Sequence, residues 1–66
     1  MEAIAAIGNT VFVESDGKVI RVDNGKATAL ELTVDQWLRF NGAYVQDPTD
    51  EQAAAAVKVA KGDKSD

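Results

Sequence analysis

Hydrophobic and polar residues alternate along much of the first half of the chain, and a period of two is typical of β-strands. Within residues 10–32 the alternating segments are rich in β-branched and aromatic residues, as strands are. Asp16-Gly17 and Asn24-Gly25 separate these segments. Both dipeptides favour two-residue hairpin loops, because such loops need positive φ at both central positions. The pattern therefore predicts a three-stranded antiparallel meander over residues 10–32.

The two loops determine which residues face each other across the strands. Val13 is expected opposite Ile20, and Phe12 opposite Arg21. One face of the sheet is then aliphatic, formed by Val11, Val13, Ile20, Val22, Ala27 and Ala29. The other face is mixed and carries Phe12, Val19 and Leu30 beside Glu14, Arg21 and Thr28.

Charges agree with this register. It places Asp23 opposite Lys26 and Lys18 opposite Glu31. Each pair of opposite charges that face each other across strands stabilises a sheet by about 0.2–1 kcal/mol. Both pairs are therefore predicted as cross-strand neighbours.

A short helix is predicted directly after the third strand. Thr33 and Gln36 have the spacing of a capping box, and Leu32 and Trp37 have that of a hydrophobic staple. Gly42 is expected to end the helix in the left-handed conformation.

This helix, residues 33–41, has only about two turns and is not stable alone. We expect it to fold back onto the aliphatic sheet face and to cover that face with Trp37 and Leu38. Trp37 is then a core residue and not a binding residue.

The remaining segments are less regular. Residues 2–7 are apolar and short, and their pattern is compatible with a strand or with a helical turn. Residues 43–46 are predicted to form a short return strand. Thr49 opens a second capping box, and the alanine-rich helix that follows runs to Ala60. This helix has little side-chain surface to bury, so it either lies closely on the sheet or projects from it.

Together these elements predict a small α+β domain. It consists of a three- to four-stranded antiparallel meander, one short helix packed on it and an Ala-rich C-terminal helix. Residues 1–62 form the single domain, and residues 63–66 form a polar tail.

Composition restricts the functions that this domain can have. The chain has 66 residues, a net charge of −4, and neither cysteine nor histidine. Cysteine-ligated metals and the commonest general base are thereby excluded, and the acidic balance disfavours nucleic acid as a partner. No apolar run approaches the ~20 residues of a membrane span, and the N-terminus does not read as a signal peptide. We expect no enzyme activity, no cofactor, no membrane partner and no small-molecule substrate, with the cytoplasm as the default location.

Three acidic residues, Asp47, Asp50 and Glu51, gather around Pro48. They are candidate cation ligands, but their spacing differs from that of a calcium-binding EF-hand loop. Negative charge at a helix N-terminus is favourable by itself, and this is the interpretation that we adopt. The Asp-Gly and Asn-Gly turns also lack the spacing of a phosphate-binding loop.

The remaining candidates are contact residues for a protein partner. Phe40 lies off the main apolar side of its helix, Arg39 is next to it, and Tyr44 follows closely. Phe12 and Arg21 share the mixed sheet face and mark a second possible contact. Aromatic residues and arginine are enriched where proteins bind each other.

The run Leu32-Thr-Val-Asp-Gln-Trp-Leu38, followed by Tyr44-Val45, resembles a pattern in small Mu-like prophage accessory proteins. In those proteins a Thr-x-Glu-Gln-Leu start opens a short helix that returns into a strand. The present chain departs from the pattern with Asp35 and Trp37, and the first half of the chain has no counterpart in it. The resemblance implies a phage-encoded protein that acts by contact, located in the virion, and it carries over no functional residues.

The sequence thus favours a non-catalytic interaction module, with a phage structural or capsid-decoration role as the specific hypothesis. Such a protein would assemble with itself, as a homo-oligomer, or with a larger shell protein. A small acidic inhibitor or adaptor that binds a host enzyme is the alternative. It would need a concentrated acidic face, whereas the acidic residues here are scattered among turns and helix starts.

Overall fold

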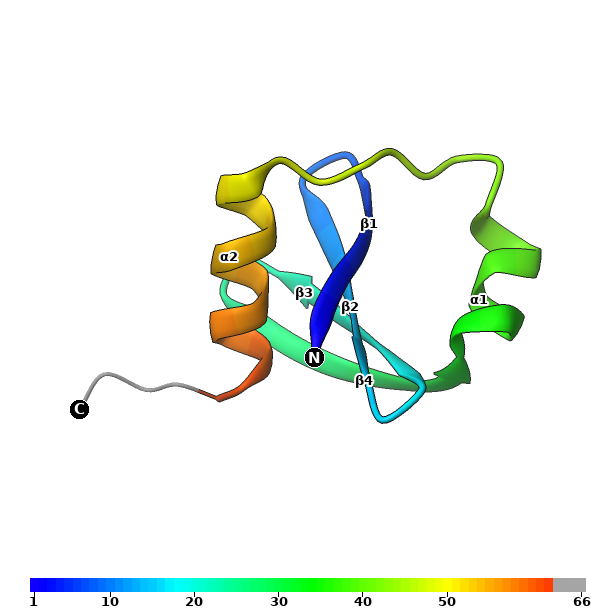
Figure 1. The fold of residues 1–66 in the computed structure, drawn as a ribbon, viewed down its shortest axis with the longest axis horizontal. Helices are drawn as coiled ribbons and strands as arrows, with labels where there is room; N and C mark the ends of the chain where they lie inside the picture. Colours follow the sequence, from blue (N-terminus) through cyan, green and yellow to red (C-terminus); the bar gives the residue numbers. More distant parts are fainter. Residues whose placement is uncertain (63–66) are drawn as a thin grey trace.

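A four-stranded antiparallel sheet with one helix on each face forms the fold (Figure 1). The computed structural model describes residues 1–62, so the predicted polar tail at 63–66 lies outside the described residues. The sheet contains β1 (Glu2–Ile7), β2 (Thr10–Ser15), β3 (Lys18–Asp23) and β4 (Lys26–Thr33), in that order. Helix α1 spans Val34–Asn41 and helix α2 spans Asp50–Ala60. The predicted small α+β class is confirmed.

Both predicted hairpin loops are present. Asp16 and Gly17 have φ angles of 54° and 81°, and Asn24 and Gly25 have φ angles of 51° and 75°. The register that these loops impose between β2 and β3 is the predicted one, with Phe12 opposite Arg21 and the valines and isoleucine paired as expected. Local turn chemistry alone is therefore sufficient to align these two strands.

One of the two predicted charge pairs is present, and the other is not. Asp23 lies opposite Lys26, as predicted, but Lys18 lies opposite Thr33 and not opposite Glu31. The reason is a register shift near the end of β4, where Glu31 has a left-handed φ of 59°. An irregularity of this kind shifts the cross-strand pairing of the residues beyond it, and the sequence does not signal it.

Residues 2–7, for which strand and helix were both open, form strand β1 against β2. A bulge between Ala3 and Ala5 shifts its register. Ile4 and Ala5 consequently both pack on the α1 side of the sheet, whereas Ala3 and Ala6 pack on the α2 side. The bulge explains why the apolar pattern of this segment shows no clean period.

The predicted return strand at 43–46 is wrong. Only one isolated bridge forms, between Ala6 of β1 and Gln46. The two residues exchange both backbone hydrogen bonds, each with an N···O distance of 2.8 Å. The fourth strand of the sheet is β1, and the segment after α1 touches the outer edge of β1 at this single point.

Helix α1 begins as predicted. Thr33 Oγ1 accepts a hydrogen bond from the Gln36 amide, and Gln36 Oε1 accepts one from the Thr33 amide. The predicted left-handed end at Gly42 is wrong, because Gly42 has a right-handed φ of −57° and its N–H donates to the Leu38 carbonyl. A β-carbon at Gly42 would lie 2.7 Å from that carbonyl oxygen. Glycine is therefore needed here for the close approach and not for a positive φ.

The predicted position of α1 on the sheet is also wrong. Trp37 packs on the mixed face with Phe12 and Val19, not on the aliphatic face. Leu38 is 42% exposed and does not cover the sheet. The chain leaves β4 on the mixed face, where Leu30 and Leu32 both pack against the Trp37 cluster, and α1 follows them.

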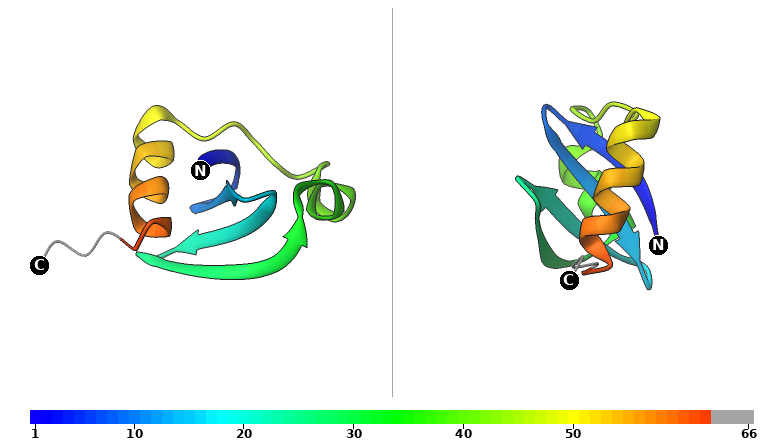
Figure 2. Two further views of the ribbon diagram at one scale, coloured as in Figure 1. Left: turned by 60° about the horizontal axis from the view of Figure 1, so that its bottom comes forward. Right: turned by 90° about the vertical axis from the view of Figure 1, so that its left-hand side faces the viewer.

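Helix α2 covers the aliphatic face, which settles whether it docks or projects. Ala56 is 2% exposed and lies in one cluster with Val11, Val13 and Val22 of the sheet. The views in Figure 2 show α2 crossing the sheet on the side opposite α1. Its capping box at Thr49 is present, and Gly62, with a positive φ of 70°, follows the C-cap Lys61.

Candidate interaction surface

Phe40 and Tyr44 are the largest apolar side chains that the fold leaves exposed. Phe40 is 74% exposed and Tyr44 is 71% exposed. They lie on one continuous stretch, residues 40–44, which we call the exposed aromatic segment. The chain has only four aromatic residues, so half of them are left in solvent.

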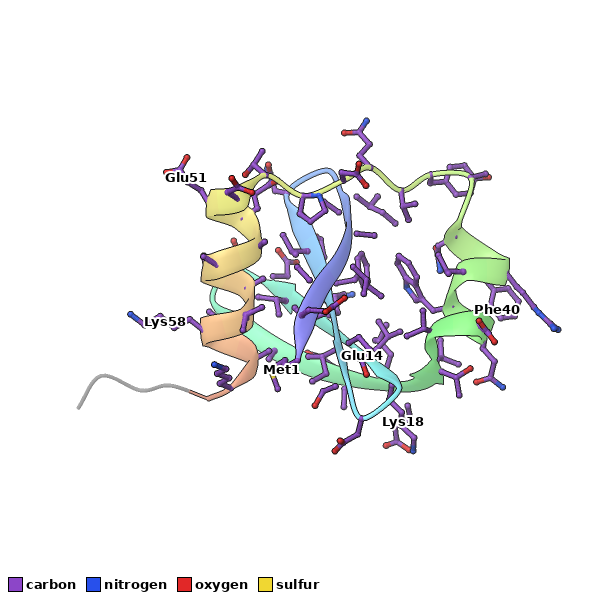
Figure 3. The ribbon with its side chains drawn as sticks, viewed as in Figure 1. Met1, Glu14, Lys18, Phe40, Glu51 and Lys58 are labelled. Atoms are coloured by element: carbon purple, nitrogen blue, oxygen red, sulfur yellow. The ribbon has the colours of Figure 1, made fainter. Side chains whose placement is uncertain are left out.

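The period of α1 places Phe40 outside the core. Val34, Trp37 and Asn41 recur at the spacing of one helix face and are the residues of α1 with buried or partly buried side chains. Asn41 Nδ2 also donates to the Trp37 carbonyl, at 3.2 Å. With this face directed at the sheet, Phe40 remains on the surface of α1, at the end of the molecule opposite Lys58 and Glu51 of α2 (Figure 3).

A turn positions Tyr44. The Tyr44 amide donates to the Asn41 carbonyl, at 2.9 Å, so the chain folds back directly after the last turn of the helix. Val45 then turns inward and joins the Trp37 cluster. Tyr44 is thus held between two anchored positions while its own ring stays exposed.

Phe12 was expected as a contact residue, and the structure corrects this. Its side chain is 7% exposed, and its ring centroid lies 4.5 Å from that of Trp37 with the planes tilted by 42°. Aromatic pairs favour tilted arrangements at such distances. Phe12 belongs to the core of the α1 side, and Trp37, 1% exposed, is the core residue that the sequence predicted.

The two candidate arginines are both exposed but lie apart in the fold. Arg39 is on α1 beside Phe40. Arg21 is in the middle of β3, in register with Phe12 on one side and Thr28 on the other. The structure therefore keeps Arg39, Phe40 and Tyr44 on one short segment and leaves Arg21 on the sheet.

Leu38 was predicted to cover the sheet, but its side chain is exposed. It directly follows Trp37, and consecutive residues on a helix point about 100° apart. Adjacent positions can still share one broad apolar face of a helix, so the sequence contains no signal that Leu38 is exposed.

The acidic residues around Pro48 do not form a metal site. Within residues 1–62, no three acidic side chains come together in an arrangement that would hold a metal ion. Asp50 and Glu51 lie in the first turn of α2, where negative charge stabilises a helix. The part of the chain that the structure describes contains no pocket.

No helix among the described residues has the length and apolar character needed to cross a membrane. Comparison of the chain with protein-family models, with curated proteins and with solved structures gives no match.

Proposed function

We propose that this chain is a non-catalytic protein–protein interaction module and that it binds its partner through the exposed aromatic segment. The observation that supports this proposal is the exposure of Phe40 and Tyr44, 74% and 71%, in a domain that buries its other two aromatic residues. Tyrosine and phenylalanine rings bury much apolar surface on binding. Two such rings on one short segment are a natural anchor for a partner.

Arg39 completes the proposed contact. It is exposed on α1 next to Phe40, and arginine is enriched at binding hot spots because it combines charge with a planar group that stacks on aromatic rings. Trp37 of α1 and Val45 after the segment pack in the same cluster and hold the segment in place from both ends. A rigid segment loses less conformational entropy on binding than a mobile one.

The specific role that we propose is attachment to a larger protein shell, as in a phage virion. It rests on the resemblance of residues 32–45 to small prophage accessory proteins, together with the exposed segment. The described acidic residues lie on all four strands, on both helices, in the β2–β3 turn and in the α1–α2 connection. This spread supports a shell attachment over an acidic inhibitor, which would concentrate its charge on one face.

The test replaces both rings, with Phe40→Ser and Tyr44→Ser in one chain, and follows co-purification with the assembly from the cells that naturally make the protein. We expect the variant to remain folded and to be lost from the assembly. The matched control is Lys58→Ser on the exposed side of α2, which should be retained. Trp37 fluorescence reports folding in each case, because the only tryptophan is buried.

Retention of the double variant would overturn the proposed contact. Recovery of the wild-type chain in a 1:1 complex with one host enzyme, and with no shell component, would support the inhibitor alternative instead.

A further inference from the structure

Strand β4 is one of the two edge strands of the sheet and differs from every other strand in its exposure. Residues 26–29 are exposed, although they lie in regular register with β3. In the left view of Figure 2, β4 is the long strand along the bottom of the molecule, with nothing beneath it. An edge strand presents unpaired backbone groups that another strand can bind.

The hairpin loop determines which backbone groups point outward. Asp23 and Lys26 flank the two-residue loop, and the residues at these positions hydrogen-bond to each other. Hydrogen-bonded and non-hydrogen-bonded pairs alternate along an antiparallel ladder, so Thr28 also bonds to β3. The N–H and C=O groups of Ala27 and Ala29 therefore point away from the sheet. No hydrogen bond among residues 1–62, outside the sheet ladders, involves these two residues.

We propose that β4 pairs antiparallel with β4 of a second copy of this chain, about a two-fold axis at Thr28. In this register Ala27 faces Ala29 of the other copy, and each pair exchanges its outward N–H and C=O groups in both directions. The two four-stranded sheets then form one continuous sheet. This surface is distinct from the exposed aromatic segment, and the inference does not depend on that segment.

The ends of the regular segment select this register. The loop at Gly25 and the irregular backbone at Glu31 limit regular geometry to residues 26–30, and Thr28 is the centre of this segment. Sliding the copies by two residues in either direction would place an outward-pointing alanine opposite Gly25 or opposite Glu31. Two-fold symmetry about an axis perpendicular to the sheet excludes shifts by one residue, because facing side chains must lie on the same sheet face.

Side chains at the contact are also compatible with a second copy. Thr28 meets Thr28, and threonine pairs are favourable cross-strand neighbours. Lys26 faces Leu30 of the other copy and not another lysine, so its charge meets no like charge across the pair and its aliphatic stem can cover the leucine. Despite a net charge of −4 per chain, the contact itself contains no acidic residue.

Hydrogen exchange of single amides, measured by NMR over a dilution series, tests the register directly. In the monomer the Ala27 and Ala29 amides face water and should exchange rapidly, while the Thr28 amide, bonded to β3, should be protected. We expect the Ala27 and Ala29 amides to become protected as the protein concentration rises, with no change at Thr28. Unchanged exchange at Ala27 and Ala29 while the chain dimerises would overturn the inference.

A single engineered cysteine gives a second test, because the natural chain has none. At a non-hydrogen-bonded pair the facing Cα atoms lie about 4.5 Å apart, within the range that a disulfide spans. Thr28→Cys should therefore cross-link to a dimer on mild oxidation, at dilutions where the control Ala54→Cys, exposed on α2, stays monomeric. Equal rates of cross-linking for the two variants would count against the proposed contact.

Sedimentation equilibrium measures self-association and shows which surface mediates it, the β4 edge or the exposed aromatic segment. Thr28→Lys should weaken self-association roughly tenfold by placing like charges opposite each other, and Phe40→Ser should leave it unchanged. A wild-type chain that stays monomeric at every concentration overturns the inference and leaves the proposed function intact. If Phe40→Ser abolishes the dimer and Thr28→Lys does not, the inference is also overturned, and the contact is assigned to the exposed aromatic segment.

Discussion

The two faces of the sheet are covered in different ways. On the α1 side a few large side chains meet, with the Trp37 ring stacked at a tilt on Phe12. On the α2 side small residues predominate, with alanines of the helix close to valines of the sheet. The first side depends on one anchor, whereas the second depends on the packing of small residues in the C-terminal half of α2, from Ala56 to Ala60, against the sheet. A chain of 66 residues thus stabilises two thin layers by two separate means.

This difference has a consequence for mutational sensitivity. Removal of one large anchor leaves a cavity that short neighbouring elements cannot fill, so its cost is concentrated at one position. A layer of small residues is instead sensitive to added volume, because an extra group forces the helix away from the sheet. The predictions below test this contrast, from the largest expected effect to the smallest.

Replacement of the anchor should have the largest effect. We expect Trp37→Ala to lower the free energy of unfolding by about 3–5 kcal/mol, which is comparable with the total stability of a domain of this size. Urea denaturation followed by circular dichroism measures the change. If Trp37→Ala stays fully stable and loses only association, then Trp37 is an interface residue and the contrast between the two sides fails.

On the other side, adding volume should be the damaging change. Ala56→Leu is expected to cost about 1–3 kcal/mol, because Ala56 lies between α2 and the valines of the sheet. Ala54→Leu is the matched control on the exposed side of the same helix, and its effect should stay within about 0.5 kcal/mol. Thermal unfolding of both variants gives the comparison, and equal losses would show that α2 does not lie closely on the sheet.

Loss of either helix cap should have a smaller effect on stability, of similar size for the two helices. Each helix begins with a threonine whose hydroxyl accepts from the amide three residues on, Thr33 in α1 and Thr49 in α2. Thr→Ala at either cap should cost about 1 kcal/mol. Chemical denaturation of the two variants checks this. A much larger loss at Thr33 would show that this residue acts through β4, of which it is the last member, in addition to capping α1.

The smallest effect on stability is expected at the exposed aromatic segment. Phe40→Ser removes a ring that is mostly in solvent, so the free energy of unfolding should change by less than about 0.5 kcal/mol. Urea titration monitored by Trp37 fluorescence is the appropriate measurement. A loss of several times this size would place Phe40 in the core of the α1 side and remove the basis of the proposed contact.

Local features could be predicted from the sequence because neighbouring residues alone determine them. The Asp-Gly and Asn-Gly loops, the β2–β3 register and both capping boxes are of this kind. The bulge in β1 and the irregularity at Glu31 depend on tertiary packing, and neither leaves a pattern in the sequence. For this reason residues 2–7 stayed open between strand and helix, and the pairing of Lys18 was predicted wrongly.

The sequence contains enough information to predict that α1 packs on the mixed face of the sheet, but we predicted the aliphatic face. Leu32 and Trp37 have the staple spacing, so Trp37 must lie on the face to which Leu32 points. Alternation along β4 puts Leu32 on the same face as Leu30, which is the mixed face. Of the proposed contact, Phe40, Tyr44 and Arg39 were identified from the sequence, whereas the burial of Phe12 follows from the position of Trp37 and was missed for the same reason.

The order of the elements along the chain also sets the order in which the two sides can form during synthesis. Every residue of the Trp37 cluster lies within residues 4–45, whereas the other cluster needs α2. At ribosomal rates of about 5–20 residues per second, Val45 precedes Ala60 by roughly one to three seconds. A chain whose tryptophan side forms before α2 docks exposes its valine face next to the open β4 edge, and docking of α2 then covers this face.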